Sequence, residues 1–176
     1  MRGGGYHIFH FDGHGYFGVR CPACRRLNPA GGEKCSACGR PLEEPEVYLS
    51  FEDEYGGEEL VSLGELSPVL GAGAVQMAFL SACRSAREVM SSAKALLRAG
   101  VSAVVGMQTA IPAEEAADFA RYLYLALARG ESLFTAVAEG RLPLLRRENT
   151  WFVPVFYGCG ETVFLPRTAT LSPEQV

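Results

Sequence analysis

Residues 74–108 read AVQMAFLSACRSAREVMSSAKALLRAGVSAVVGMQ, and this stretch decides the fold class. Residues 74–81 are mostly apolar and predict a buried parallel strand, and residues 101–107 predict a second one. Between them, residues 86–99 repeat apolar side chains at helical spacing, and Gly100 is placed to end the helix. A strand, a helix and a further strand in succession predict an α/β fold with a mainly parallel sheet covered by helices.

The same alternation continues on both sides of this stretch. Before it, residues 6–11 predict a short aromatic-rich strand, and a Tyr-Gly-Gly turn between residues 47–54 and 58–63 predicts a β-hairpin. After it, a helix is expected to start at Pro112 and to end at Gly130. The remaining expected elements are a helix over residues 132–146 and strands over residues 151–157 and 162–165.

Length, charge and cysteine usage restrict the class of protein. A chain of 176 residues can form one ordinary domain with a small appendage, and its net charge of −4 offers no general attraction for nucleic acid or membrane. No apolar run approaches the roughly 18 residues that a membrane helix needs, and the first residues lack the apolar centre of a signal peptide. We therefore expect a cytoplasmic protein that does not bind membranes.

Residues 20–42, which we call the ribbon, differ from the rest of the chain in composition. They contain the pairs Cys21/Cys24 and Cys35/Cys38 but few large apolar residues, so they cannot build a hydrophobic core of their own. Two Cys-x-x-Cys pairs about ten residues apart predict one tetrahedral zinc site with four thiolate ligands, which is a structural site because no coordination position stays open. A thioredoxin-like redox pair is disfavoured, because its strand and helix context is absent.

His14 lies in Gly13-His14-Gly15, directly after the first predicted strand. Flanking glycines permit a tight turn that leaves the imidazole uncovered, and a neutral histidine is a suitable general base near pH 7. By itself, this short motif favours a surface or structural loop histidine, because a single short motif is weak evidence for catalysis. Asp12 is placed to orient His14, although so short a separation makes a direct hydrogen bond uncertain. His7 and His10 point to opposite faces of a strand and form no metal site.

Cys83 lies where the strand over residues 74–81 turns into a helix. A helix that begins there directs its positive end toward the sulfur and favours the thiolate, whereas a buried, inert cysteine is the alternative. Neighbouring parallel strands bring their carboxyl ends to one edge of the sheet, so His14 and Cys83 are predicted to meet as base and nucleophile. The backbone N–H groups of Gly15 and Cys83 would then form an oxyanion hole.

The paired segments HFDGHG (10–15) and LSACRSA (80–86) together resemble the signature of the CHAT domain family, which is related to caspases and separases. The segment LSFEDE (49–54), the segment LLRAGVSAVVGMQ (96–108) and the strand WFVPV (151–155) resemble further family segments. The resemblance covers nearly the whole chain outside the ribbon. It implies a caspase-like domain formed by residues 1–19 and 43–176, interrupted by the ribbon at residues 20–42.

This resemblance also implies an activity. His14 matches the catalytic histidine of the family and Cys83 its nucleophile, which cleaves peptide bonds through a thioester. The pocket for the substrate residue before the scissile bond matches Ser81, Met107, Gln108 and Thr109. The expected protein is a cysteine endopeptidase that acts on protein or peptide substrates as a regulated module of a larger bacterial signalling or defence system.

The chain departs from the family before the histidine strand, where the caspase-like sheet has two more strands and a helix. Only residues 1–5 precede the strand here, so the expected sheet lacks its first strands. Such a strand exposes an unpaired edge, and we expect a missing N-terminal segment or a partner chain to complete the sheet.

Two other interpretations remain open from the residues. The first is a non-catalytic caspase-like scaffold whose ribbon mediates interactions. The second is a nucleic-acid-binding ribbon, suggested by its arginines and lysine, but we favour an ordinary solvated face for these side chains and do not expect a nucleic-acid partner.

Overall fold

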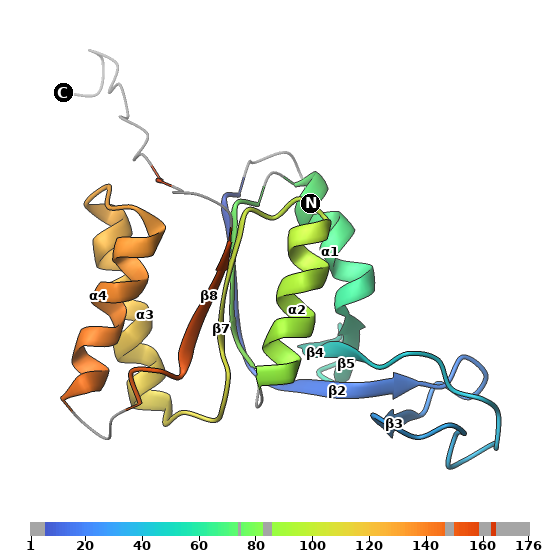
Figure 1. Cartoon of the computed structure of the whole chain (residues 1–176). Coiled ribbons are helices and arrows are strands. Elements are labelled where there is room, and N and C mark those ends of the chain that lie inside the picture. The colour runs from blue at the N-terminus through green and yellow to red at the C-terminus, as the bar shows by residue number, and fades with distance from the viewer. Residues whose placement is uncertain (1–5, 74, 83–85, 147–149, 159–162, 165–176) are drawn as a thin grey trace. The chain divides into compact units, whose positions relative to one another are not determined.

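The computed structural model describes residues 6–73, 75–82, 86–146, 150–158 and 163–164 (Figure 1). The chain divides into two compact units, one formed by Met1–Pro112 with Phe152–Cys159 and the other by Ala113–Trp151 with Gly160–Val176. The first unit contains two four-stranded sheets, and the second contains a helical pair. In the part of the chain that the structure describes, no helix has the length and apolar character needed to cross a bilayer.

The first sheet is the mainly parallel one that the sequence predicts. Its strand order is β1-β6-β7-β8, from strands β1 (Ile8–Asp12), β6 (Met77–Ser81), β7 (Ala103–Met107) and β8 (Pro154–Gly158). β1 pairs parallel with β6, and β6 pairs parallel with β7, whereas β8 runs antiparallel to β7. Three of the four strands therefore end at the same edge of the sheet.

The second sheet is antiparallel, with the order β3-β2-β4-β5. It consists of strands β2 (Gly15–Arg20), β3 (Leu27–Pro29), β4 (Glu46–Glu52) and β5 (Glu58–Ser62). The β4–β5 hairpin confirms the prediction, but the sequence analysis did not predict β2, whose two glycines weaken the strand pattern. Gly18 allows β2 to lie close to β3, because a Cβ atom at this position would be 2.3 Å from the carbonyl oxygen of Asn28 on β3.

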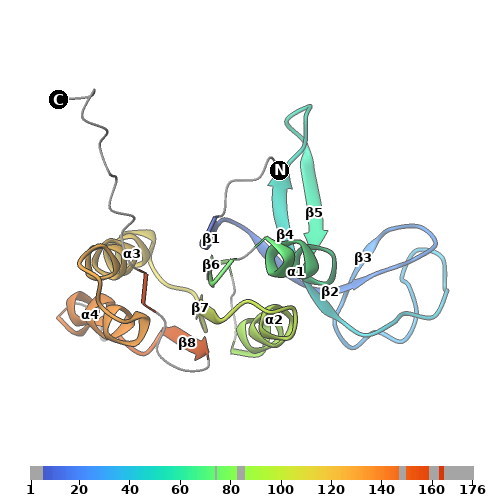
Figure 2. The same cartoon turned by 90° about the horizontal axis from the view of Figure 1, so that it is seen from above.

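Two helices lie on one side of the parallel sheet (Figure 2). Helix α2 (Ala86–Arg98) was predicted, and Gly100 follows it with a φ of +101°, as suits a residue that ends a helix. Helix α1 (Leu63–Ala72) was not predicted, because Pro68 and two glycines obscure its pattern. It begins at a capping box in which the Ser62 hydroxyl accepts the Glu65 N–H and the Glu65 carboxylate accepts the Ser62 N–H.

The hydrophobic core of the first unit joins both sheets to both helices. Buried apolar side chains of the parallel sheet meet those of the antiparallel sheet and of the two helices. Representative members are Phe11 and Leu80 on β1 and β6, Leu49 on β4, Leu70 on α1 and Leu96 on α2. The outward face of the antiparallel sheet therefore stays polar, while its inward face anchors the sheet to the rest of the unit.

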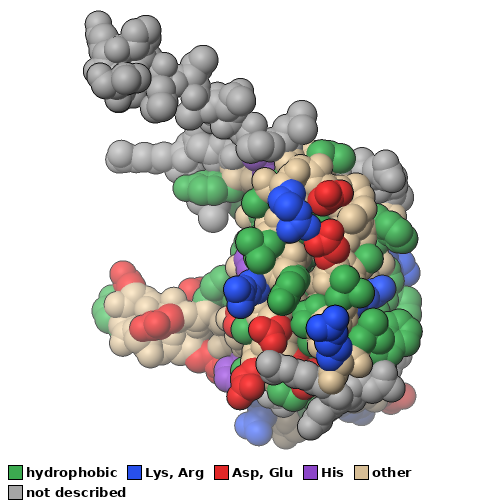
Figure 3. All heavy atoms as spheres, turned by 90° about the vertical axis from the view of Figure 1, so that its left-hand side faces the viewer, with side chains coloured by type: hydrophobic (Ala, Val, Ile, Leu, Met, Phe, Trp, Pro, Cys, Tyr) green, Lys and Arg blue, Asp and Glu red, His purple; other side chains and the backbone are tan. Residues whose placement is uncertain are grey.

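The second unit is a pair of packed helices, α3 (Ala113–Ala128) and α4 (Leu133–Leu145). Ser132 caps α4 by accepting the N–H of Thr135, and Gly140 lets α4 approach the Phe119 ring closely. Apolar and charged side chains are mixed on the face of the molecule that Figure 3 shows. Of the predicted strand at residues 162–165, Val163 forms an isolated bridge with Ser132, while residues 162 and 165 lie outside the described residues.

Gly71 offers a test of how closely α1 packs in this unit. A Cβ atom at Gly71 would lie 1.9 Å from the carbonyl oxygen of Ala99, which follows α2. The Gly71→Ala variant should therefore lose roughly 1–3 kcal/mol of unfolding free energy, because backbone must move to admit the methyl group. Urea denaturation measures this loss. The matched Gly32→Ala variant, whose new methyl group would meet its nearest atom at 3.7 Å, should unfold close to the wild-type midpoint. Equal midpoints for both variants would contradict the tight packing.

Candidate functional site

The carboxyl ends of β1 and β6 form the centre of the candidate site. The two strands pair in parallel with Asp12 opposite Ser81, so the loops that follow them start side by side. The Gly13 N–H donates to the Ser81 carbonyl at 3.5 Å. A Cβ atom on Gly15 would lie 2.8 Å from the carbonyl oxygen of Ala82, so only glycine permits this approach. The loop that carries His14 therefore contacts the residue directly before Cys83.

The predicted base lies among the described residues, and the predicted nucleophile does not. His14 is exposed, and its carbonyl oxygen accepts the Ser50 N–H at 3.0 Å, which ties its loop to β4. Cys83 lies outside the described residues together with Arg84 and Ser85. The pairing of its thiol with His14, and the role of its N–H beside that of Gly15 in an oxyanion hole, stay predictions.

The predicted pocket residues lie at the ends of β6 and β7. Ser81 is half-buried and Met107 is buried, whereas Gln108 is half-buried and Thr109 is exposed. The backbone of Gln108 donates to the Val153 carbonyl at 3.0 Å, and its side-chain amide donates to the Phe152 carbonyl at 2.6 Å. Because β6 and β7 are parallel neighbours, these residues share the sheet edge with His14.

His10 is exposed on β1, but its ring packs against the neighbouring strand. Its ring meets Phe79 on β6 edge to face, with the centroids 4.3 Å apart. Burial lowers the pKa of His10 and outweighs the opposing charge of Asp12. The edge-to-face contact between this imidazole and the Phe79 ring supports the pairing of β1 with β6.

A polar cluster beside His14 was missed by the sequence analysis. The Glu58 carboxylate on β5 accepts hydrogen bonds from the Tyr16 hydroxyl at 3.0 Å and from the Ser50 hydroxyl at 2.7 Å. The hydrogen bonds from Ser50 and then from Tyr16 lower the pKa of Glu58, desolvation opposes them with a smaller effect, and the charge of His14 lowers it least. The three residues come from β2, β4 and β5, so only strand pairing, and no local motif, brings them together.

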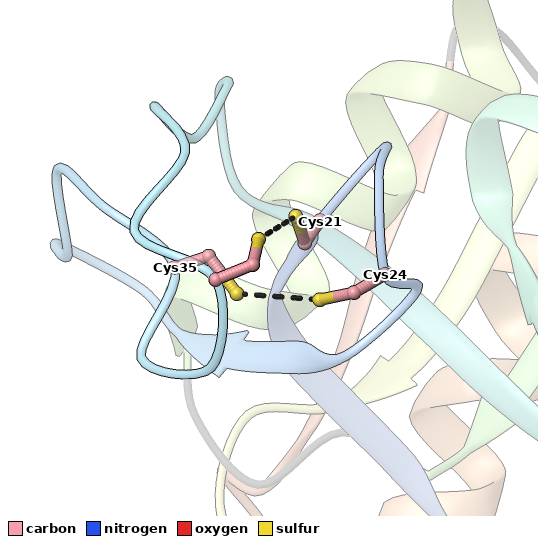
Figure 4. A group of neighbouring side chains, drawn as sticks. Cys21, Cys24 and Cys35 are labelled. Carbon is pink, nitrogen blue, oxygen red and sulfur yellow. Dashed lines mark hydrogen bonds between the residues drawn. The ribbon is translucent and has the colours of Figure 1, made fainter.

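The four cysteines of the ribbon converge as predicted (Figure 4). Their sulfur atoms all lie within 4.8 Å of one another, and the pairs Cys21–Cys38 and Cys24–Cys35 are 3.5 Å apart. Tetrahedral zinc with bonds of about 2.3 Å would separate its sulfur ligands by about 3.8 Å. The arrangement therefore fits a four-coordinate metal ion.

Each cysteine pair lies in the same type of turn. Arg25 donates its N–H to the Cys21 carbonyl at 2.9 Å, and Gly39 donates to the Cys35 carbonyl at 2.9 Å. Both donors adopt the left-handed conformation, with φ of 61° for Arg25 and 72° for Gly39. Two matched turns explain why sulfur atoms far apart in the sequence face one centre.

The thiols of Cys24 and Cys35 differ in how readily they ionise. Backbone N–H groups of Ala37 and Cys38 lower the pKa of Cys35 to about 6. Although the Arg26 backbone lowers it, the pKa of Cys24 is raised to about 11, chiefly by the neighbouring Cys35 sulfur. Gathered thiolates repel one another, and a bound cation removes that repulsion.

Asn28 supports the cluster from inside the ribbon. Its side chain is buried, and its amide nitrogen donates to the Arg26 carbonyl at 2.9 Å and lies 3.6 Å from the Cys35 sulfur. Its amide oxygen accepts the N–H and the hydroxyl of Ser36. One side chain thus holds both cysteine turns in register.

The ribbon continues the sheet that carries His14. Strand β2 runs from Gly15, next to His14, to Arg20, next to Cys21, and β3 of the ribbon pairs with it. A groove of about 820 Å³ separates the ribbon from the β4–β5 hairpin. Its charged lining residues are Arg20, Arg25, Asp53, Glu54, Glu58, Glu59 and Glu65.

Comparison with known proteins gives one positive finding. A family model described as the CHAT domain matches residues 1–157 of the 176-residue chain. No curated protein matches the sequence.

Replacement of Asn28 tests its supporting role. Asn28→Ala should weaken metal binding roughly 10- to 100-fold, because residues that orient ligands control affinity to that extent. Titration with Co²⁺, read from thiolate-to-cobalt absorption, measures the affinity. Ser36→Ala, which removes only one hydroxyl partner of Asn28, should bind cobalt nearly as tightly as the wild type. An unchanged affinity in Asn28→Ala would show that the two cysteine turns keep their positions without Asn28.

Proposed function

This chain belongs to the CHAT domain family, and on that premise we propose that it is a caspase-like cysteine endopeptidase with His14 and Cys83 as its catalytic dyad. The observation that carries the proposal is the contact between the two loops at the sheet edge. The backbone of Gly15 packs against Ala82, which precedes Cys83 in the chain. This contact supports the dyad, because β1 and β6, which precede His14 and Cys83 in the chain, end side by side.

The proposed reaction uses the chain's own residues. His14 takes the thiol proton of Cys83, and the thiolate attacks the carbonyl carbon of the scissile peptide bond. The N–H groups of Gly15 and Cys83 donate to the resulting oxyanion. His14 gives its proton to the leaving amine, and water then hydrolyses the thioester. The substrate side chain before the scissile bond enters the pocket formed by Ser81, Met107, Gln108 and Thr109.

We also propose that the four cysteines hold zinc in a structural role. Four sulfur atoms that all lie within 4.8 Å of one another match the preference of zinc for tetrahedral thiolate sites. A closed site leaves no position for substrate, so zinc would fold the ribbon and supply no catalytic chemistry. Because β3 of the ribbon pairs with β2, a folded ribbon supports the strand that begins next to His14.

The edge of the parallel sheet supports the expectation of a further strand. Among the described residues, β1 pairs with β6 alone. A segment of this protein or of a partner chain would extend the sheet there. A regulated enzyme in a larger system, located in the cytoplasm, remains part of this proposal.

The reactivity of Cys83 tests the dyad without knowledge of the substrate. An unassisted thiol is about 3 % ionised at pH 7, so His14→Ala should slow alkylation of Cys83 by iodoacetamide up to roughly 30-fold. Peptide mass spectrometry measures the rate at Cys83 separately from other cysteines. The matched His7→Ala variant should react like the wild type. Equal rates in the His14→Ala and wild-type proteins would exclude the proposed dyad, and Cys83→Ala must abolish any peptide cleavage that the wild type shows.

Metal analysis tests the ribbon independently of activity. The purified protein should contain about one zinc ion per chain, and Cys35→Ser should lose it because a three-thiolate site binds far more weakly. Elemental analysis measures the metal, and limited proteolysis between residues 20 and 42 reports the folding of the ribbon. Cys159→Ser, which lies outside both cysteine pairs, is the control and should keep its zinc. Full zinc content in Cys35→Ser would show that the cluster is not the site.

A further inference from the structure

We propose that Glu58 is a positioning residue for the dyad: its carboxylate, held by the hydroxyls of Tyr16 and Ser50, orients and stabilises the protonated imidazole of His14. This inference rests on the proposed peptidase function and adds a third member that the sequence motifs do not contain. It starts from the geometry of the outward face of the antiparallel sheet.

Strand register places His14 and Glu58 on the same face of that sheet. Gly15 pairs with Leu49, so the preceding residue, His14, lies opposite Ser50, and the Ser50 N–H donates to the His14 carbonyl at 3.0 Å. On the other side of β4, Glu58 pairs with Glu52, two residues from Ser50 and on its face. Ser50 therefore lies between the base and the carboxylate.

The carboxylate of Glu58 is held in place by hydrogen bonds from β4, which pairs with β5, and from β2 on the far side of β4. Tyr16, two residues after His14 on the same face, donates its hydroxyl to Glu58 at 3.0 Å, and the Ser50 hydroxyl donates to the same oxygen at 2.7 Å. The second carboxylate oxygen is not used by either bond. Ser50 thus fixes the His14 backbone with its N–H and Glu58 with its hydroxyl, which couples the position of the two residues.

The electrostatics agree with this geometry. His14 is near enough that its charge contributes to the lowered pKa of Glu58, after the two hydrogen bonds. An ionised carboxylate beside an imidazole favours the imidazolium, the form that His14 takes when it accepts the Cys83 proton. A base that is oriented by a third group is the arrangement by which histidine activates a nucleophile in many hydrolytic enzymes. Asp12, the candidate named from the sequence, is the alternative partner.

The experiment measures iodoacetamide alkylation of Cys83 at pH 7 in the full chain. Glu58→Gln keeps the shape of the side chain and removes its charge, and it should slow the reaction roughly two- to fivefold, as expected for an exposed charge pair. Glu58→Asp should recover part of the rate. The control is Glu59→Gln, the same substitution one residue along β5 and on the opposite face, which should leave the rate unchanged. The alkylation rate of the Asp12→Asn variant tests Asp12 as the alternative partner of His14.

A second measurement does not depend on the peptidase proposal. The C2 proton resonance of the His14 imidazole, assigned by its loss in His14→Ala, should shift in Glu58→Gln, while those of His7 and His10 stay in place. If Glu58→Gln does not fold, as judged by circular dichroism, then Glu58→Asp and the double variant Tyr16→Phe/Ser50→Ala decide the question by the same two readouts.

The outcomes separate the two proposals. Slow alkylation in His14→Ala together with a wild-type rate and an unmoved His14 resonance in Glu58→Gln would overturn the role of Glu58 and leave the dyad intact. A rate that falls in Asp12→Asn alone would assign the role to Asp12. A wild-type rate in His14→Ala would instead remove the dyad itself.

Discussion

The parallel hydrogen-bonded pairing of β1 with β6 is the constraint on which the rest of the site depends. Parallel neighbours end at the same edge of a sheet, and here Asp12 stands opposite Ser81. The loops that follow are then short enough to touch, and glycine at position 15 removes the Cβ atom that would separate them. If the register shifted by one residue, every inward side chain of β1 would turn to the other face, and both the core and the site would be lost.

The two faces of the antiparallel sheet have different roles. Its inward face, which includes Val47 and Leu49, is buried in the core, so its outward face is free to carry polar groups. Strand β2 connects the His14 loop at one end to the first cysteine of the ribbon at the other. The ribbon is an insertion in the sequence but a continuation of the sheet in space. Its four-cysteine cluster therefore lies at the end of the strand that begins next to His14.

The elements that the sequence predicted and those that it missed differ in where their stabilising contacts lie. The strand β6 and the helix α2 have strong local patterns, and the four cysteines carry their ligand chemistry in their spacing, so all were predicted. Strand β2 holds two glycines and gains its stability from β3 and β4, and helix α1 contains Pro68 and gains its stability from the core. For the same reason no local pattern marked Glu58, whose partners Tyr16 and Ser50 lie on other strands.

The sequence by itself determined the α/β class, the family, the four cysteines that can hold a metal ion and the two residues proposed as base and nucleophile. Each of these depends on residue type, spacing or periodicity, which short stretches of chain carry. Only the tertiary structure decided that the His14 loop packs against Ala82, that the ribbon extends the sheet of β2, and that Tyr16 and Ser50 hold the Glu58 carboxylate. These relations depend on strand register and on backbone contacts between segments that are distant in the chain, and such contacts leave no local pattern in the residues that make them.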